Sequence, residues 1–361
     1  MKSNAIKLIC SVLALSGFIS QAGCSSAPKA QIARDNQEVQ NKFEEANQLL
    51  DNKRYEDAAK AYDRLRVDKP VNQLDYFILL NAGVAYQSMG DCITAGERYR
   101  QVIRVTNNKA PETQALARLR LSEMLTCQGQ DKLAIVNLVE LYRNKRFLPT
   151  ESADAEIPAR LAAAYAREGN KKLADRYFKE AEMGYRKIIG KNMSEKQKPL
   201  LAKTLYYMGN MSHINPEKMT GNDYYTTVQS LQGYLYRALE IGAENWSELA
   251  AVQLEDAYKN VWVYLDKPAP AGSDDIQQRE FESEKRDVAN QALVALRQLY
   301  REKTPGSAQK PATNSVMTTL NKTEKQIQNF LATNRVGTSL TEEAKKAGAL
   351  RQDLPKKEKK K

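Results

Sequence analysis

Histidine and cysteine are scarce in this chain of 361 residues, which holds one His and four Cys. That scarcity argues against most zinc sites, histidine-based catalytic triads and iron–sulfur clusters. The sequence also lacks a phosphate-binding glycine loop, a G-x-S-x-G turn and an H-E-x-x-H motif. The single histidine, His213, has no Cys, Asp or Glu at ligand spacing. We therefore expect no metal site, no cofactor and no enzymatic activity.

Long apolar runs are equally rare. The one strong run, residues 8–19, follows Lys2 and Lys7 and has the sequence LICSVLALSGFI. It is too short to cross a bilayer, which takes ~20 apolar residues, and a basic start followed by such a run is typical of an export signal. The pattern predicts a signal peptide over residues 1–23.

The end of this segment resembles a bacterial lipoprotein signal. The two residues before Cys24 are small, Ala22 and Gly23, as that family requires, whereas Gln21 stands where Leu is usual. The resemblance implies that the Cys24 thiol receives a diacylglyceryl group. Ser25, rather than Asp, follows the cysteine, and this implies sorting to the outer membrane.

Lipidation of Cys24 would anchor the protein stably, because several acyl chains at one N-terminus bind a membrane firmly. With the sorting implied by Ser25, the protein would lie on the outer membrane, facing the periplasm. Residues 24–33 would then be the lipidated cysteine and a short flexible tether. The alternative is an ordinary secretory signal in which the cysteine is incidental.

Repetition dominates residues 34–190. Four segments each hold an apolar helix with a small residue, a turn, and a second helix with an Ala followed by two closing residues. The small residues of the first helices are Ala46, Gly83, Ser122 and Ala162, the turn residues are Lys53, Gly90, Gly129 and Gly169, the small residues of the second helices are Ala58, Ala95, Ala134 and Ala174, and the closing pairs are Tyr62/Leu65, Tyr99/Val102, Leu138/Leu141 and Phe178/Ala181. Small residues let two helices approach closely, and the large ones fill the space beside them.

This pattern resembles the tetratricopeptide repeat (TPR), whose period is 34 residues. The resemblance implies an all-α fold, a TPR-type α-solenoid built of helix hairpins. Beyond the four TPR-like pairs, residues 191–265 are expected to form degenerate repeat helices and residues 266–333 further C-terminal helices. Residues 334–361 are expected to be a disordered basic tail, because Glu342–Lys361 holds eight Lys or Arg against four Asp or Glu.

The TPR resemblance also implies a groove that binds a partner protein. By analogy its lining comes from Phe43, Asn47, Leu50, Phe77, Leu80, Val84, Gln87 and Arg167. In the alternative, Phe43 and Phe77 simply pack against neighbouring helices.

Cys92 and Cys127 fall at the same edge of adjacent repeats, so either a disulfide between them or two free thiols fits the pattern.

The sequence thus predicts a lipid-anchored scaffold for other envelope proteins, in a motility, secretion, pilus or barrel-assembly complex. No nucleic-acid partner is expected, and the tail is either solvated or in contact with an anionic surface. The alternative is a periplasmic protein that binds or cleaves peptidoglycan through residues 190–333, which would need a polar cleft there. A cytoplasmic TPR adaptor is a third possibility.

Overall fold

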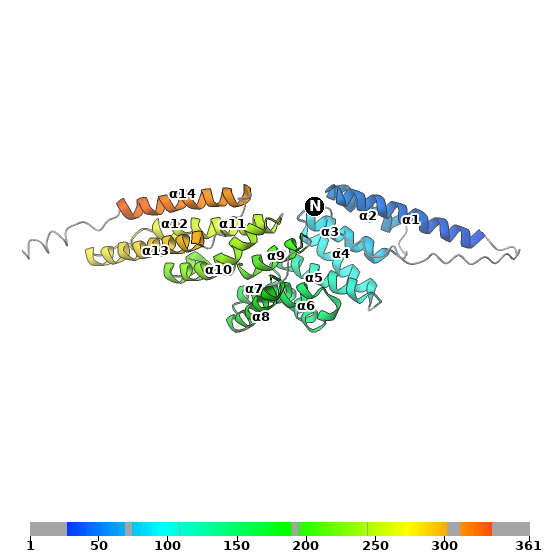
Figure 1. The fold of residues 1–361 in the computed structure, drawn as a ribbon, viewed down its shortest axis with the longest axis horizontal. Coiled ribbons are helices and arrows are strands. Elements are labelled where there is room, and N and C mark those ends of the chain that lie inside the picture. The colour runs from blue at the N-terminus through cyan, green and yellow to red at the C-terminus, as the bar shows by residue number, and fades with distance from the viewer. Residues whose placement is uncertain are drawn as a thin grey trace, which may run out of the picture. The chain divides into compact units, whose positions relative to one another are not determined.

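The computed structural model describes residues 27–68, 74–107, 109–189, 194–195, 197–243, 245–301 and 311–333 (Figure 1). All regular structure within these ranges is helical, which confirms the predicted all-α, TPR-type class. The chain divides into two compact units, Met1–Asn192 and Met193–Lys361. Cys24 and residues 334–361 lie outside the described ranges, so the lipidation site and the tail remain predictions.

The first unit consists of helices that pack in chain order. They are α1 (Ala27–Asp51), α2 (Tyr55–Asp68), α3 (Asp75–Ser88), α4 (Cys92–Thr106), α5 (Pro111–Cys127), α6 (Asp131–Arg143), α7 (Ile157–Arg167) and α8 (Lys171–Ile189), with a 3₁₀ turn η1 (Lys145–Phe147) and a π-helical turn η2 (Ser152–Glu156) before α7. Each helix from α1 to α7 packs against the next, so the four predicted pairs form four stacked hairpins.

The turn of every hairpin adopts a left-handed backbone conformation. The φ angles are 61° at Lys53, 82° at Gly90, 70° at Gly129 and 75° at Gly169. Glycine reaches this region without steric penalty because it has no Cβ. The first hairpin is the exception, since its turn carries a lysine.

Replacing Lys53 by Gly is therefore expected to raise the free energy of unfolding by about 0.5–1 kcal/mol. The left-handed penalty of roughly 1–2 kcal/mol for a residue with a Cβ disappears, partly offset by the greater entropy of glycine in the unfolded chain. Urea titration followed by circular dichroism measures the change. Gly129→Ala is the converse control and should lower stability by about 1 kcal/mol; a loss of stability in Lys53→Gly would contradict this explanation.

Small residues lie where the helices of a hairpin meet. The fully buried ones include Ala46, Ala58, Ala95, Ser122 and Ala134. At Gly83 a Cβ would fall 2.5 Å from Cε1 of the Tyr99 ring. The repeat's alternation of small and large residues is thus a packing requirement.

The fourth hairpin departs from the predicted register. Ala174 and Phe178 are only half-buried, and Tyr177 is the buried aromatic residue of α8. The reason is that α8 packs against η2 as well as α7. The approach is so close that a Cβ on Gly184 would lie 2.0 Å from the carbonyl oxygen of Asp154. This contact rotates the buried face of α8.

Helix α1 corrects one boundary. It begins at Ala27, so residues 27–33 are helical, whereas the sequence analysis predicted a flexible tether over residues 24–33. Pro28 does not prevent this, because a proline in the first helical turn gives up no intrahelical hydrogen bond. The residues that follow are mostly good helix formers.

The second unit is built around a long central helix. Its elements are α9 (Lys198–Met208), η3 (Pro216–Lys218), α10 (Gly221–Ile241), α11 (Trp246–Lys259), α12 (Val261–Leu265), α13 (Asp275–Arg301) and α14 (Pro311–Thr333). Helix α10 packs against α9, α11 and α13, and α14 packs against α11 and α13. Helices α11 and α12 are separated at Asn260, whose Nδ2 donates to the Tyr224 hydroxyl at 2.8 Å.

Candidate protein-binding site

The first helices of the first two hairpins bring two amides together, of which Asn47 is half-buried and Asn81 is only 8 % exposed. We call the surface around them the α1–α3 face and define it by Phe43, Asn47, Phe77, Asn81 and Val84. Helical spacing places Phe43 and Asn47 one turn apart on α1, and Phe77, Asn81 and Val84 on one side of α3. Helices α1 and α3 contact each other directly. Residues from two repeats therefore meet on one surface.

Hydrogen bonds fix the amide of Asn47. Its Oδ1 accepts from the Tyr62 hydroxyl at 2.6 Å and from Asn81 Nδ2 at 2.8 Å. Burial raises the pKa of Tyr62 above its usual value, so the phenol remains a donor at neutral pH. Among the described residues, nothing bonds to Asn47 Nδ2 or to Asn81 Oδ1. One donor and one acceptor are thus held in place, unused, on adjacent helices.

The flanks of the α1–α3 face are apolar and partly exposed. Phe43 is half-buried against the core of the first hairpin, with its ring centroid 6.1 Å from that of Tyr62. Phe77 is half-buried, and its ring centroid lies 4.3 Å from that of Tyr76. Val84 is also half-buried. Phe43 does pack against its neighbours, as the alternative proposed, and yet part of each side chain reaches the surface.

Two of the predicted groove residues lie in the core instead. Leu50 is 5 % exposed and Leu80 is 1 % exposed. Leu50 follows the small residue Ala46 by four positions, and Leu80 precedes Gly83 by three, so each shares the buried stripe of its helix. Their assignment to the groove lining was wrong for this reason.

Gln87 and Arg167 are also engaged within the fold. Gln87 Oε1 accepts from the Tyr99 hydroxyl at 2.7 Å. Arg167 donates from Nε and Nη2 to the two carboxylate oxygens of Asp131, at 2.8 and 2.7 Å. This bidentate pair joins α6 to α7, so it connects the third hairpin to the fourth. Neither side chain belongs to the α1–α3 face.

Asn81 is the residue that the sequence analysis missed. In the repeat alignment Asn47 follows the small residue Ala46 by one position, whereas Asn81 precedes Gly83 by two. The two are not equivalent within the repeat, and they meet through the direct contact between α1 and α3. A polar residue inside an otherwise apolar helix, DYFILLNAGVAY, is the one signal that marked it.

The structure joins Cys92 and Cys127 in a disulfide. Cys92 is the first residue of α4 and Cys127 the last of α5, with their Cα atoms 6.3 Å apart. Next to the bridge, Gln128 Nε2 donates to the Cys92 carbonyl oxygen at 2.7 Å. The bridge covalently ties the second hairpin to the third.

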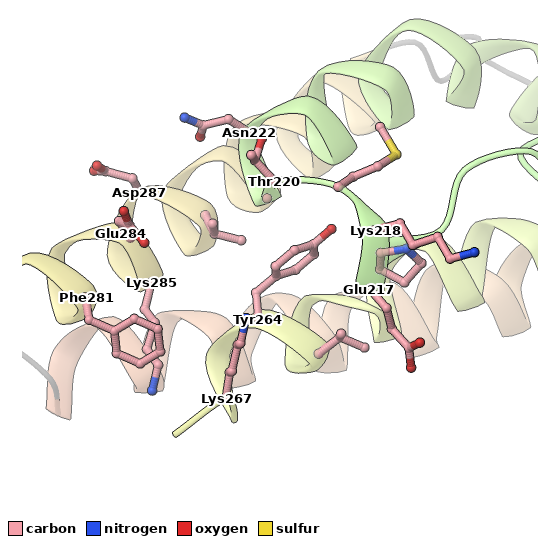
Figure 2. A pocket seen from close by; sticks show the side chains of 15 residues that line it. Glu217, Lys218, Thr220, Asn222, Tyr264, Lys267, Phe281, Glu284, Lys285 and Asp287 are labelled. Atoms are coloured by element: carbon pink, nitrogen blue, oxygen red, sulfur yellow. The ribbon is translucent and has the colours of Figure 1, made fainter. Parts of the chain in front are cut away.

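The second unit contains a cavity of about 820 Å³ (Figure 2). Three segments form it: η3 with the start of α10, the end of α12, and the first half of α13. Tyr264 lies at its floor, and its hydroxyl is buried without a hydrogen-bond partner in the described part of the chain. Burial raises the pKa of Tyr264 to about 12. We call this hollow the second-unit cavity.

Neither metal ligation nor membrane spanning is indicated in the described ranges. No group of three His, Cys, Asp or Glu there is arranged to hold a metal ion. No described helix combines the length and hydrophobicity that crossing a bilayer would require.

Comparisons with known proteins add little. No protein-family model matches the chain, and no curated protein matches it. One similar solved structure is the C-terminal part of a TPR repeat-containing protein from Cytophaga hutchinsonii, which is 16% identical over 80% of this chain and 99% of that one, with a TM-score of 0.36. The TPR-like character of this chain rests on its own stacked hairpins, left-handed turns and buried small residues.

Proposed function

We propose that this protein is a non-catalytic, lipid-anchored scaffold that holds other envelope proteins together in an outer-membrane-associated complex. Motility, secretion, pilus and barrel-assembly machines are the candidates. The observation that carries the proposal is the α1–α3 face, where stacked TPR-like hairpins present an ordered amide pair between apolar side chains. The partner is another protein.

The α1–α3 face suits an extended segment of that partner. Each non-proline residue of an extended segment offers one backbone C=O acceptor and one N–H donor, which match Asn47 Nδ2 and Asn81 Oδ1. Phe43 and Phe77 would cover apolar side chains on either side. Because hydrogen bonds hold the Asn47 amide in place before binding, little of its side-chain entropy remains to be lost.

An exported location is supported by two features. The N-terminal sequence resembles a lipoprotein signal, and the Cys92–Cys127 disulfide belongs to a type of bond that persists in oxidising compartments such as the periplasm. Asn47 lies twenty residues along α1 from Ala27, which is about 30 Å at 1.5 Å per residue. The helix that carries Phe43 and Asn47 begins at Ala27, three residues after Cys24 in the sequence.

Replacing Asn47 by Asp tests the binding role. The carboxylate still accepts from Tyr62 and Asn81 but removes the Nδ2 donor, so capture of the partner from crosslinked envelopes should fall about five- to tenfold, at an unchanged melting temperature. Asn41→Asp makes the same charge change on an exposed position of the same helix and should leave capture unaffected. Equal capture by Asn47→Asp and the wild type would contradict the proposed face.

The second-unit cavity favours a second candidate, binding to the cell wall. It falls within residues 190–333, where the alternative placed its polar cleft, and carboxylates of Glu217, Glu284 and Asp287 line it. Sedimentation of the full chain with purified peptidoglycan sacculi tests this candidate. Co-sedimentation that is lost in the Glu284→Gln/Asp287→Asn variant would favour it over the scaffold.

A further inference from the structure

We propose that the second-unit cavity binds a short segment of a partner protein that carries both amine and carboxylate groups. The proposal rests on the scaffold role only for the source of that segment. The site is distinct from the α1–α3 face, since it is built entirely from the second unit. It would give the scaffold a second protein contact of different chemistry.

The cavity arises where the repeat pattern fails. In the TPR-like hairpins a short turn joins two helices, whereas α9 and α10 are joined by residues 209–220. Side chains order this connection: Gln253 Oε1 accepts from Met211 N at 3.1 Å, Asn215 Oδ1 from Glu217 N at 2.8 Å, and Thr220 Oγ1 from Asp223 N at 3.1 Å. One wall of the hollow is therefore preformed.

The opposite wall is α13, which is held tightly against the start of α10. A Cβ on Gly221 would lie 2.2 Å from Cγ2 of Val288, so only glycine permits this approach without a shift. Figure 2 shows Glu284 and Asp287 on the α13 side and Glu217 and Lys218 on the other, with Tyr264 between them. Two fixed walls thus face each other across a hollow.

Charges of both signs surround the cavity without neutralising one another. Glu217, Lys218, Lys267, Glu284 and Asp287 line it, and no ion pair joins any of these five to another described residue. Lys285, which also lines it, pairs with Glu282 at 3.5 Å. A ligand with an amine and a carboxylate could pair with both sets at once. A ligand of one sign would gain one set of contacts and meet repulsion from the other.

The aromatic residues argue for a peptide rather than a sugar. The Lys285 ammonium lies 4.9 Å from the centroid of the Phe281 ring and covers one of its faces. The Tyr264 hydroxyl is buried at the floor. The volume of about 820 Å³ lies within the ~300–1,000 Å³ typical of ligand pockets, so the cavity has room for a few residues and not for a folded domain.

The test uses the full chain labelled with methyl-¹³C methionine, because Met219 lines the cavity and reports on it directly. The probe is the hexapeptide acetyl-Lys-Glu-Lys-Glu-Lys-Glu-amide. Two hexapeptides in which Gln replaces every Glu or every Lys are the single-sign controls. The mixed peptide should shift the Met219 methyl signal and bind about fivefold more tightly than either control.

Charge-neutralising variants complete the test. Glu284→Gln/Asp287→Asn and Lys218→Gln/Lys267→Gln should each weaken the mixed peptide about fivefold. Glu255→Gln/Asp256→Asn removes one Glu and one Asp charge from α11, outside the cavity, and should leave the affinity for the mixed peptide unchanged.

Three outcomes would overturn the proposal. They are equal binding of the single-sign peptides, unchanged binding by both cavity variants, and tighter binding of soluble muropeptides, which would assign the cavity to the cell wall. Anchoring at Cys24 and capture through Asn47 are read out separately, so failure of the scaffold role would not be mistaken for failure of this site.

Discussion

Replacing Arg160 by Ala is expected to lower the free energy of unfolding of the first unit by about 3–5 kcal/mol. Arg160 is 2 % exposed, and it donates to the Leu119 carbonyl oxygen at 3.0 Å and to Ser122 Oγ at 2.7 Å. Its Nη1 also lies 3.5 Å from Oε1 of Glu156, which is itself 2 % exposed. The substitution removes the cation and leaves buried acceptors and a buried carboxylate without it.

The large effect follows from burial and not from the ion pair as such. Removing one member of a buried ion pair leaves the charge of the other without compensation. Replacing both by residues of similar volume often changes the free energy of unfolding little. The double variant Glu156→Gln/Arg160→Met should therefore regain at least half of the loss. Arg176→Ala breaks a pair with Glu180 in which Arg176 is exposed, and should change stability by less than about 1 kcal/mol.

Tryptophan fluorescence provides an internal control, because both Trp residues of the chain, Trp246 and Trp262, lie in the second unit. Urea titration followed by circular dichroism should show the destabilisation of the first unit, while the fluorescence transition stays in place. A loss below about 1 kcal/mol, or an equal shift of both transitions, would contradict the role assigned to Arg160.

Loss of the Cys92–Cys127 disulfide is expected to lower the stability of the first unit by about 3–4 kcal/mol. The bridge closes a loop with a sequence separation of 35 residues, and the entropy that such a cross-link removes from the unfolded chain corresponds to this range. The variant Cys92→Ser/Cys127→Ser, measured by urea titration, gives the value directly.

Reduction of the wild type is the matched experiment. Dithiothreitol should destabilise the oxidised wild type by a similar amount and leave the double serine variant unchanged. Destabilisation of the variant by the reductant, or no loss in either protein, would show that the bridge does not stabilise the fold as described.

The turn and packing positions of the repeats could be predicted from the sequence because each is local. A turn residue after an apolar helix and an Ala five positions later are read within one segment, and the structure gives Lys53, Gly90 and Gly129 the same left-handed turn. The fourth hairpin could not be predicted as well. Its register depends on contact with the π-helical turn η2, and no residue pattern in α8 predicts that contact.

The candidate sites were less accessible to sequence reasoning, since they depend on contacts between segments. Asn47 was singled out, but its partner Asn81 is bonded to it across two repeats. The second-unit cavity requires η3, α12 and α13 to converge, and nothing in their separate sequences specifies that arrangement. Family analogy assigned Leu50 and Leu80 to the groove, whereas each lies on the buried stripe of its helix.

The membrane anchor is tested most directly by the Cys24→Ser variant of the full chain, expressed with its signal and separated into soluble and membrane fractions. The wild type should appear in the outer-membrane fraction and carry a lipid on Cys24 by mass spectrometry, because acyl chains supply the membrane affinity. The variant should be recovered as soluble periplasmic protein. A variant that remains in the membrane fraction would contradict a lipid-anchored scaffold.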